Sequence, residues 1–249
     1  MYIHKRTMSN GKELLFGMYN NEKGFNQMRA KTLLTKEPET ITWLDTMTSS
    51  DVLWDVGACV GTYSIYAAVM NECKVVSFEP SANNFQMLQK NIFINEMHEN
   101  IVAFPLALGT KFKYDLLLYN QPYKIGSSSN DVLTSKYTTH KKRKSGGCIV
   151  DSINNLVNRG IEYPTYLKID VDGIENDIIK GATKVIPNLK SILIELYSDK
   201  KEDLKTIKKI ESLGFTIDEE LYNISADRHD KTLSWRGMRN YIFWRNDAV

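Results

Sequence analysis

The sequence predicts a single α/β domain with a mostly parallel sheet and helices on both of its faces. From residue 52 onward, short apolar runs typical of strands alternate with segments of helical spacing. The first apolar run, 52–56, stops at a glycine, as a parallel strand does where it turns into a helix. A chain of 249 residues can bury a full-sized core.

Residues 1–50, called here the lead-in, are expected to pack on the main domain, which is expected to span 51–249. In the lead-in we expect a short strand at 13–16 and helices near 24–34 and 38–47. The main domain is expected to contain strands at 52–56, 74–78, 101–106, 114–119, 166–170, 192–195 and 241–244.

Helices are expected between these strands. Ile65, Ala68 and Val69 recur at helical spacing after residue 62, and residues 85, 88 and 92 form one apolar stripe after residue 81. A further helix is expected from residue 175. The segment 201–213 places acidic residues first and lysines later, which complements a helix dipole.

Composition excludes several classes of protein. Hydrophobic residues make up 42% of the chain and charged residues 25%, which is typical of a packed domain. The net charge of +2 lacks the basic excess of a dedicated nucleic-acid binder, so no nucleic-acid partner is expected. No apolar run has the length of a membrane span, and the N-terminus is too polar for a secretory signal. Three scattered cysteines favour a reducing cytoplasm.

The segment 55–61 combines a strand end with two glycines, Gly57 and Gly61. Glycine lets a backbone turn sharply and approach a ligand closely. Cys59 stands between them, so the segment is not a Gly-x-Gly-x-x-Gly dinucleotide fingerprint. An unliganded tight turn is the alternative interpretation of this loop.

Glu79 supports the interpretation as a ligand site. It ends the next strand, eighteen residues after Gly61, where a carboxylate can accept hydrogen bonds from both hydroxyls of a ribose. NAD enzymes use a similar spacing. Asp55 favours S-adenosylmethionine instead, because that molecule carries an ammonium group that a carboxylate can bind.

Four segments resemble successive motifs of the FkbM family of methyltransferases, namely DVGACVGTYSIYAA, VVSFEPSANNFQMLQKN, FPLALG and YLKIDVDGIENDIIKGA. The resemblance covers roughly residues 37–197. It implies a Rossmann-like class I methyltransferase fold with a mostly parallel seven-stranded sheet. It also implies methyl transfer from S-adenosylmethionine to a hydroxyl of a sugar, a glycan or glycolipid, or a polyketide-like small molecule. Cys59 and Asp172 depart from the residues usual in the family, asparagine and glutamate.

The resemblance also assigns the cofactor site. Asp55 and the glycine loop would line the methionine end, Glu79 the ribose, and Ala107 and Leu108 the adenine. The full set of expected cofactor-binding residues is Asp55, Gly57, Ala58, Cys59, Gly61, Glu79, Ala107 and Leu108.

Three acids are the candidate catalytic residues. Asp170 and Glu195 end adjacent strands, and Asp172 lies in the loop that follows Asp170. Ligands of such folds sit beyond the carboxyl ends of the strands, so these acids are expected to bind acceptor hydroxyls and to take up the proton. A magnesium-type ion at Asp170 and Glu195 is an alternative, as is capping of the helix from residue 175 by Asp170 or Asp172. Lys168 is expected to be a structural partner for a carboxylate.

Two rival functions remain open. Residues 120–123, Asn-Gln-Pro-Tyr after a predicted strand, resemble the motif with which amino-methyltransferases hold a planar nitrogen in protein or nucleic acid. A true motif of that kind would follow a strand next to the strand 52–56. The other rival is a binding protein that keeps the fold without the reaction. The irregular stretch 110–150 and the lead-in are expected to form the acceptor pocket. His140 is a candidate general base and the basic run 141–144 a candidate site for a phosphate or an anionic glycan, but a solvated loop is the favoured interpretation of both.

Overall fold

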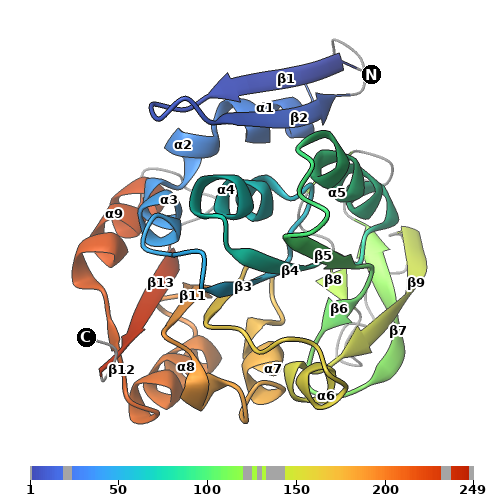
Figure 1. Cartoon of the computed structure of the whole chain (residues 1–249). Helices are drawn as coiled ribbons and strands as arrows, with labels where there is room; N and C mark the ends of the chain where they lie inside the picture. The colour runs from blue at the N-terminus through green and yellow to red at the C-terminus, as the bar shows by residue number, and fades with distance from the viewer. Residues whose placement is uncertain are drawn as a thin grey trace.

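The centre of the molecule is a seven-stranded sheet in the order β12-β13-β11-β10-β3-β4-β5 (Figure 1). The computed structural model describes residues 2–18, 24–119, 125–127, 131–132, 144–230 and 237–246. The strands of this sheet are β3 (Val52–Val56), β4 (Lys74–Phe78), β5 (Ile101–Phe104), β10 (Tyr166–Ile169), β11 (Ser191–Tyr197), β12 (Phe215–Ile217) and β13 (Met238–Arg245). All neighbours are parallel except β13, which is antiparallel to β11 and β12. The predicted Rossmann-like fold is confirmed.

Helices cover both faces of this sheet (Figure 1). One face carries α3 (Pro38–Leu44), α4 (Thr62–Asn71), α5 (Ala82–Ile94) and α9 (Glu219–Asp230), and the other carries α6 (Ile153–Asn158), α7 (Glu175–Lys180), the 3-10 turn η1 (Ile186–Asn188) and α8 (Lys201–Ser212). Side chains along β3 alternate between the two cores. Trp54 and Val56 pack with the second group of helices, and Leu53 packs with the first. Because both faces are buried, the strand appears in the sequence as one continuous apolar run.

The lead-in contains more structure than the sequence predicted. The expected strand at 13–16 is β2 (Glu13–Met18), which pairs with the unpredicted strand β1 (Tyr2–Thr7) as an antiparallel hairpin. Two short helices follow, α1 (Phe25–Lys31) and α2 (Leu33–Lys36). The hairpin is attached to α5, since Asn91 Oδ1 accepts the Gly17 N–H at 2.9 Å and Asn95 Oδ1 accepts the Leu15 N–H at 2.9 Å.

A second, four-stranded sheet lies beside β5, in the order β6-β9-β7-β8. Its strands are β6 (Ala107–Leu108), β7 (Lys113–Tyr119), β8 (Asp131–Val132) and β9 (Lys144–Asp151). The strand expected at 101–106 is shorter than predicted: β5 ends at Phe104, before Pro105, which has no N–H to donate to a ladder. The strand expected at 114–119 is β7. Residues 120–123, His140 and 141–143 lie outside the described residues.

Candidate functional site

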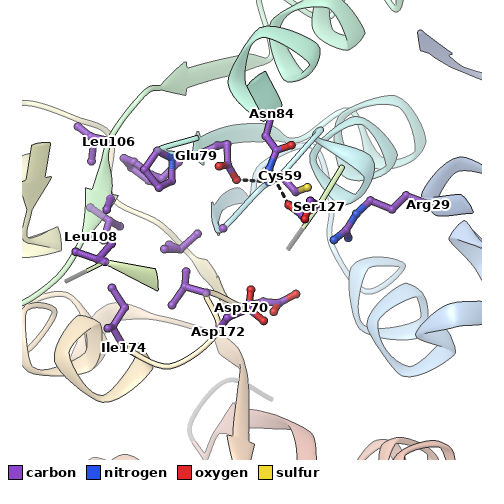
Figure 2. Close-up of a pocket in the computed structure, with 17 residues that line it drawn as sticks. Arg29, Cys59, Glu79, Asn84, Leu106, Leu108, Ser127, Asp170, Asp172 and Ile174 are labelled. Carbon is purple, nitrogen blue, oxygen red and sulfur yellow. Dashed lines mark hydrogen bonds between the residues drawn. The ribbon is translucent and has the colours of Figure 1, made fainter. Parts of the chain in front are cut away.

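A pocket of about 640 Å³, counting its open mouth, lies at the carboxyl ends of β3, β4 and β10 (Figure 2). Its walls come from the lead-in, both sheets and the loops after these strands. The lining residues are Arg29, Val56, Gly57, Cys59, Phe78, Glu79, Pro80, Asn84, Leu106, Ala107, Leu108, Ser127, Val132, Asp170, Val171, Asp172 and Ile174.

The glycine loop forms one side of the pocket, and its two glycines have different reasons to be glycine. Gly57 lines the pocket with φ of +83°, and a Cβ there would lie 2.0 Å from the carbonyl oxygen of Asp170. Gly61 does not line the pocket. Its φ is +80°, and a Cβ would lie 2.3 Å from the Leu88 side chain. Gly57 thus allows β3 and β10 to meet, whereas Gly61 allows the loop to pack on α5.

Glu79 follows β4 and fixes the loop from the other side. Its Oε2 accepts the Cys59 N–H at 2.9 Å, and its Oε1 accepts the Ser81 N–H at 2.8 Å. The side chain is buried, and burial raises the pKa of the carboxyl to about 7 although both N–H groups favour its ionised form. Glu79 still lines the pocket, as the assignment to a ribose requires.

The far end of the pocket is apolar. Ala107 and Leu108 line it from β6, with Leu106 and Ile174 beside them (Figure 2). A flat aromatic base buries its faces well against aliphatic side chains of this kind.

Two of the three candidate catalytic acids line the pocket. Asp170 follows β10, and its Oδ2 lies 3.3 Å from Nζ of Lys168. Asp172 lies in the next turn with φ of +63°. Glu175 closes this turn, since its Oε1 accepts the N–H of Gly173 at 2.9 Å, and burial raises its pKa to about 7. The helix α7 has Ile174 as its N-cap, so neither Asp170 nor Asp172 occupies the N-cap position.

Several predicted residues lie outside the pocket lining. Asp55 is 1% exposed, accepts a hydrogen bond from the Ser64 hydroxyl at 2.6 Å and lies 3.6 Å from Nζ of Lys168. Lys168 therefore has the carboxylate partners expected of it. Ala58 and Gly61 belong to the loop without lining the cavity. Glu195 lies on β11 next to β10, half-buried. Its pKa is raised well above the usual value by burial and then by Asp170 and other acids.

Sequence reasoning missed the polar lining residues Arg29, Asn84 and Ser127. Arg29 reaches the pocket from α1 of the lead-in, and its Nε donates to the carbonyl oxygen of Gly126 at 2.8 Å. Asn84 on α5 binds the same segment, accepting the Gly126 N–H at 2.8 Å and donating to the Ser127 carbonyl at 3.1 Å. These contacts join segments far apart in the chain, and no local pattern indicates them.

The described residues also bear on the alternative metal site and on the amino-methyltransferase motif. Among them, no group of three His, Cys, Asp or Glu side chains is arranged to hold a metal ion. The neighbours of β3 are β10 and β4, whereas β7, which precedes residues 120–123, belongs to the second sheet. The amino-methyltransferase motif would require the position that β10 occupies. In the part of the chain that the structure describes, no helix has the length and apolarity to cross a membrane.

Known structures share this fold. The METTL16 MTase domain in its second crystal form is 13% identical and covers 97% of this chain and 86% of its own, with a TM-score of 0.50. The N-terminal domain of human METTL16 in complex with SAH is also 13% identical, covers 97% of this chain and 88% of its own, and has a TM-score of 0.49. These distant similarities concern the fold alone.

The sequence comparisons are more specific. The Hexuronic acid methyltransferase AglP of Haloferax volcanii is 26% identical over 176 residues, which are 67% of this chain and 65% of that protein, just under two thirds. Residues 55–217 match the family described as Methyltransferase FkbM domain. That span is more than half of the 249 residues and contains the glycine loop, Glu79 and Asp170. The chain belongs to the FkbM methyltransferase family.

Proposed function

We propose that this methyltransferase transfers the methyl group of S-adenosylmethionine to a hydroxyl oxygen. The acceptor we propose is a sugar, a glycan or glycolipid, or a polyketide-like small molecule in the cytoplasm. Membership of the FkbM family supports the reaction class. The similarity to a protein named as a hexuronic acid methyltransferase supports a sugar acceptor over the other classes.

One observation carries the proposal: the order of chemical groups along the pocket. An apolar end at Leu106 and Leu108 is followed by the Glu79 carboxylate and then by Arg29 and Asp170 (Figure 2). S-adenosylmethionine has the same order, with a base, a ribose and a charged amino acid. The residues present therefore fit this cofactor. When bound, it supplies a methyl group on a positively charged sulfur.

Asp170 is the residue to which we assign uptake of the acceptor proton. It lies at the pocket, its side chain is 29% exposed, and the ammonium of Lys168 at 3.3 Å stabilises its negative charge. A base of this kind contributes roughly 10²–10⁴-fold to a reaction rate. Asp172 lines the same end of the pocket and can accept hydrogen bonds from other acceptor hydroxyls.

Glu195 suits a different role. Burial and the neighbouring acids raise its pKa well above the usual value and so favour the protonated carboxyl, which can donate a hydrogen bond to an acceptor oxygen but is poorly suited to remove a proton. We therefore propose Glu195 as an acceptor-binding residue and Asp170 as the base.

The test is incubation with methyl-labelled S-adenosylmethionine and separated pools of glycans, small metabolites, protein and RNA, with and without a chelator. We expect label in the glycan or small-metabolite pool, and a loss of roughly 10²-fold or more with Asp170→Asn. Asp177→Asn is the matched control, because Asp177 is an exposed partner of Lys180 outside this pocket. Label in protein or RNA would contradict the proposal, and loss of transfer with the chelator would add a metal ion.

A further inference from the structure

Arg29 occupies the end of the pocket opposite its apolar residues (Figure 2). It projects from α1, a helix of the lead-in, which lies outside the matched family span of 55–217. Its Nε donates to the Gly126 carbonyl at 2.8 Å, and this bond fixes the direction of the guanidinium. The guanidinium faces the pocket (Figure 2).

The two terminal nitrogens of Arg29 have no ion-pair or hydrogen-bond partner within the described part of the chain, although the side chain is mostly buried. Other arginines of the same region are paired. Arg6 donates to two carbonyls at the end of α1, and Arg228 forms an ion pair with Glu39 at 2.7 Å. Cys59, Asp170 and Glu37 lie near enough to raise the pKa of Arg29, but neither acid forms an ion pair with it. A partly buried guanidinium that has no close ion pair within the described residues and faces a cavity is a binding group for an anion that arrives with a ligand.

We propose that Arg29 binds the carboxylate of the methionine part of S-adenosylmethionine. This inference rests on the proposed function. With the base against Leu106 and Leu108 and the ribose at Glu79, the amino acid end of the cofactor reaches the side of the pocket where Arg29 lies. The planar guanidinium matches a carboxylate with two parallel hydrogen bonds, which lysine cannot provide. The lead-in then supplies a residue of the cofactor site itself.

Two ligands that differ at the amino acid end separate this role from general support of the pocket. S-adenosylhomocysteine carries the carboxylate, whereas 5′-methylthioadenosine keeps the base, ribose and sulfur and lacks it. We would measure the dissociation constants of both by calorimetry for the wild type, Arg29→Gln and Arg29→Lys. Lys31→Gln is the control, since Lys31 is an exposed cation on the same helix.

We expect Arg29→Gln to weaken S-adenosylhomocysteine roughly 10- to 100-fold, the usual contribution of a charge-assisted hydrogen-bonded group, and to change 5′-methylthioadenosine less than about 3-fold. Arg29→Lys should lie between, and Lys31→Gln should change neither. An equal loss for both ligands would overturn the proposal in favour of a supporting role. Unchanged binding of both would overturn it in favour of an acceptor carboxylate. If the wild type bound neither ligand, the proposed function itself would fail.

Discussion

The carboxyl group of Glu79 has two roles: it accepts backbone hydrogen bonds from the surrounding loops, and in the proposed function it binds the ribose of the ligand. Each of its oxygens already accepts one backbone N–H, and burial raises its pKa to about 7. Each carboxylate oxygen can accept a further hydrogen bond, which ribose hydroxyls would supply. Such donors favour the ionised form, so a ligand bound here should lower the pKa of Glu79.

Binding of S-adenosylhomocysteine should therefore depend on pH. Below pH 7 the free protein holds the proton that ligand binding must release, so affinity should fall as pH falls, by at most about 10-fold per pH unit. The affinity should level off above pH 7. Calorimetry at pH 5.5–8 in two buffers of different ionisation enthalpy measures both the affinity and the released proton. Glu79→Gln should bind weakly with little dependence on pH, and a constant wild-type affinity would contradict this account.

Gly57 is the second residue whose role can be tested alone. Gly57→Ala places a Cβ 2.0 Å from the Asp170 carbonyl and forces alanine into a φ of +83°. We expect a loss of stability of at least about 1–3 kcal/mol from backbone strain, with displacement of the Asp170 loop. Gly147→Ala is the control, because no heavy atom lies within 4 Å of its Cβ position. Equal unfolding temperatures for the two variants would show that a Cβ close to the Asp170 carbonyl does not lower stability.

Two neighbouring strands, β3 and β10, share one buried ion network. Lys168 of β10 is 1% exposed and lies 3.6 Å from Asp55 of β3 and 3.3 Å from Asp170. Asp55 was expected to line the methionine end of the site, and the structure places its carboxylate inside this network. We therefore propose that Asp55 acts on the site through Lys168, which positions Asp170.

Removal of the lysine charge tests this pairing. Lys168→Met should destabilise the fold by about 3–5 kcal/mol in urea denaturation, because Asp55 is left buried without its cation. The double variant Asp55→Asn with Lys168→Met should recover part of that loss, since no uncompensated charge remains. Lys180→Met removes an exposed ion pair with Asp177 and should cost less than about 1 kcal/mol. Strict additivity of the two core substitutions would refute the network.

How well each element could be predicted depends on where its stabilising contacts are. β3, β4, β10 and β11 are buried on both faces, so each is an apolar run that the sequence displays directly. β1 has one exposed face and β9 contains Gly146 and Gly147, which weaken a strand signal. The sequence analysis also missed α6 and β12, because they are short, and α9, because it is weakly amphipathic. Arg29 could not be predicted at all, because only packing of the lead-in on the core brings it to the pocket.

At the scale of the whole molecule, the site is a concentration of buried acids. Burial raises the pKa of Glu79 and Glu175 to about 7 and that of Glu195 well above its usual value. Each of these groups binds a proton more tightly in the folded chain than in the unfolded chain. Between about pH 4.5 and 7 the folded state therefore holds more protons, and its stability falls as pH rises.

Other groups with shifted pKa values affect stability mainly outside this pH range. Glu37 and Asp51 have lowered pKa values, so the stability that they contribute is lost only as pH falls below about 4.5. His4 has a lowered pKa and opposes the trend below pH 6.5, but it is a single group near the surface. The acids of the site should therefore dominate the interval between pH 5 and pH 7.

The upward pKa shifts of the buried acids determine how stability depends on pH. Urea denaturation of the ligand-free protein should show less stability at pH 7 than at pH 5, with each buried acid contributing at most about 1.4 kcal/mol per pH unit. Glu195→Gln should flatten the slope, because an amide keeps the shape without titrating. Glu99→Gln, at an exposed position, should leave the slope unchanged. Saturating S-adenosylhomocysteine should add more stability at pH 7 than at pH 5, since it favours ionised Glu79. A rise in the stability of the ligand-free protein from pH 5 to pH 7 would mean that these acids are already ionised in the folded chain. The roles proposed for Glu79 and Glu195 would then both be wrong.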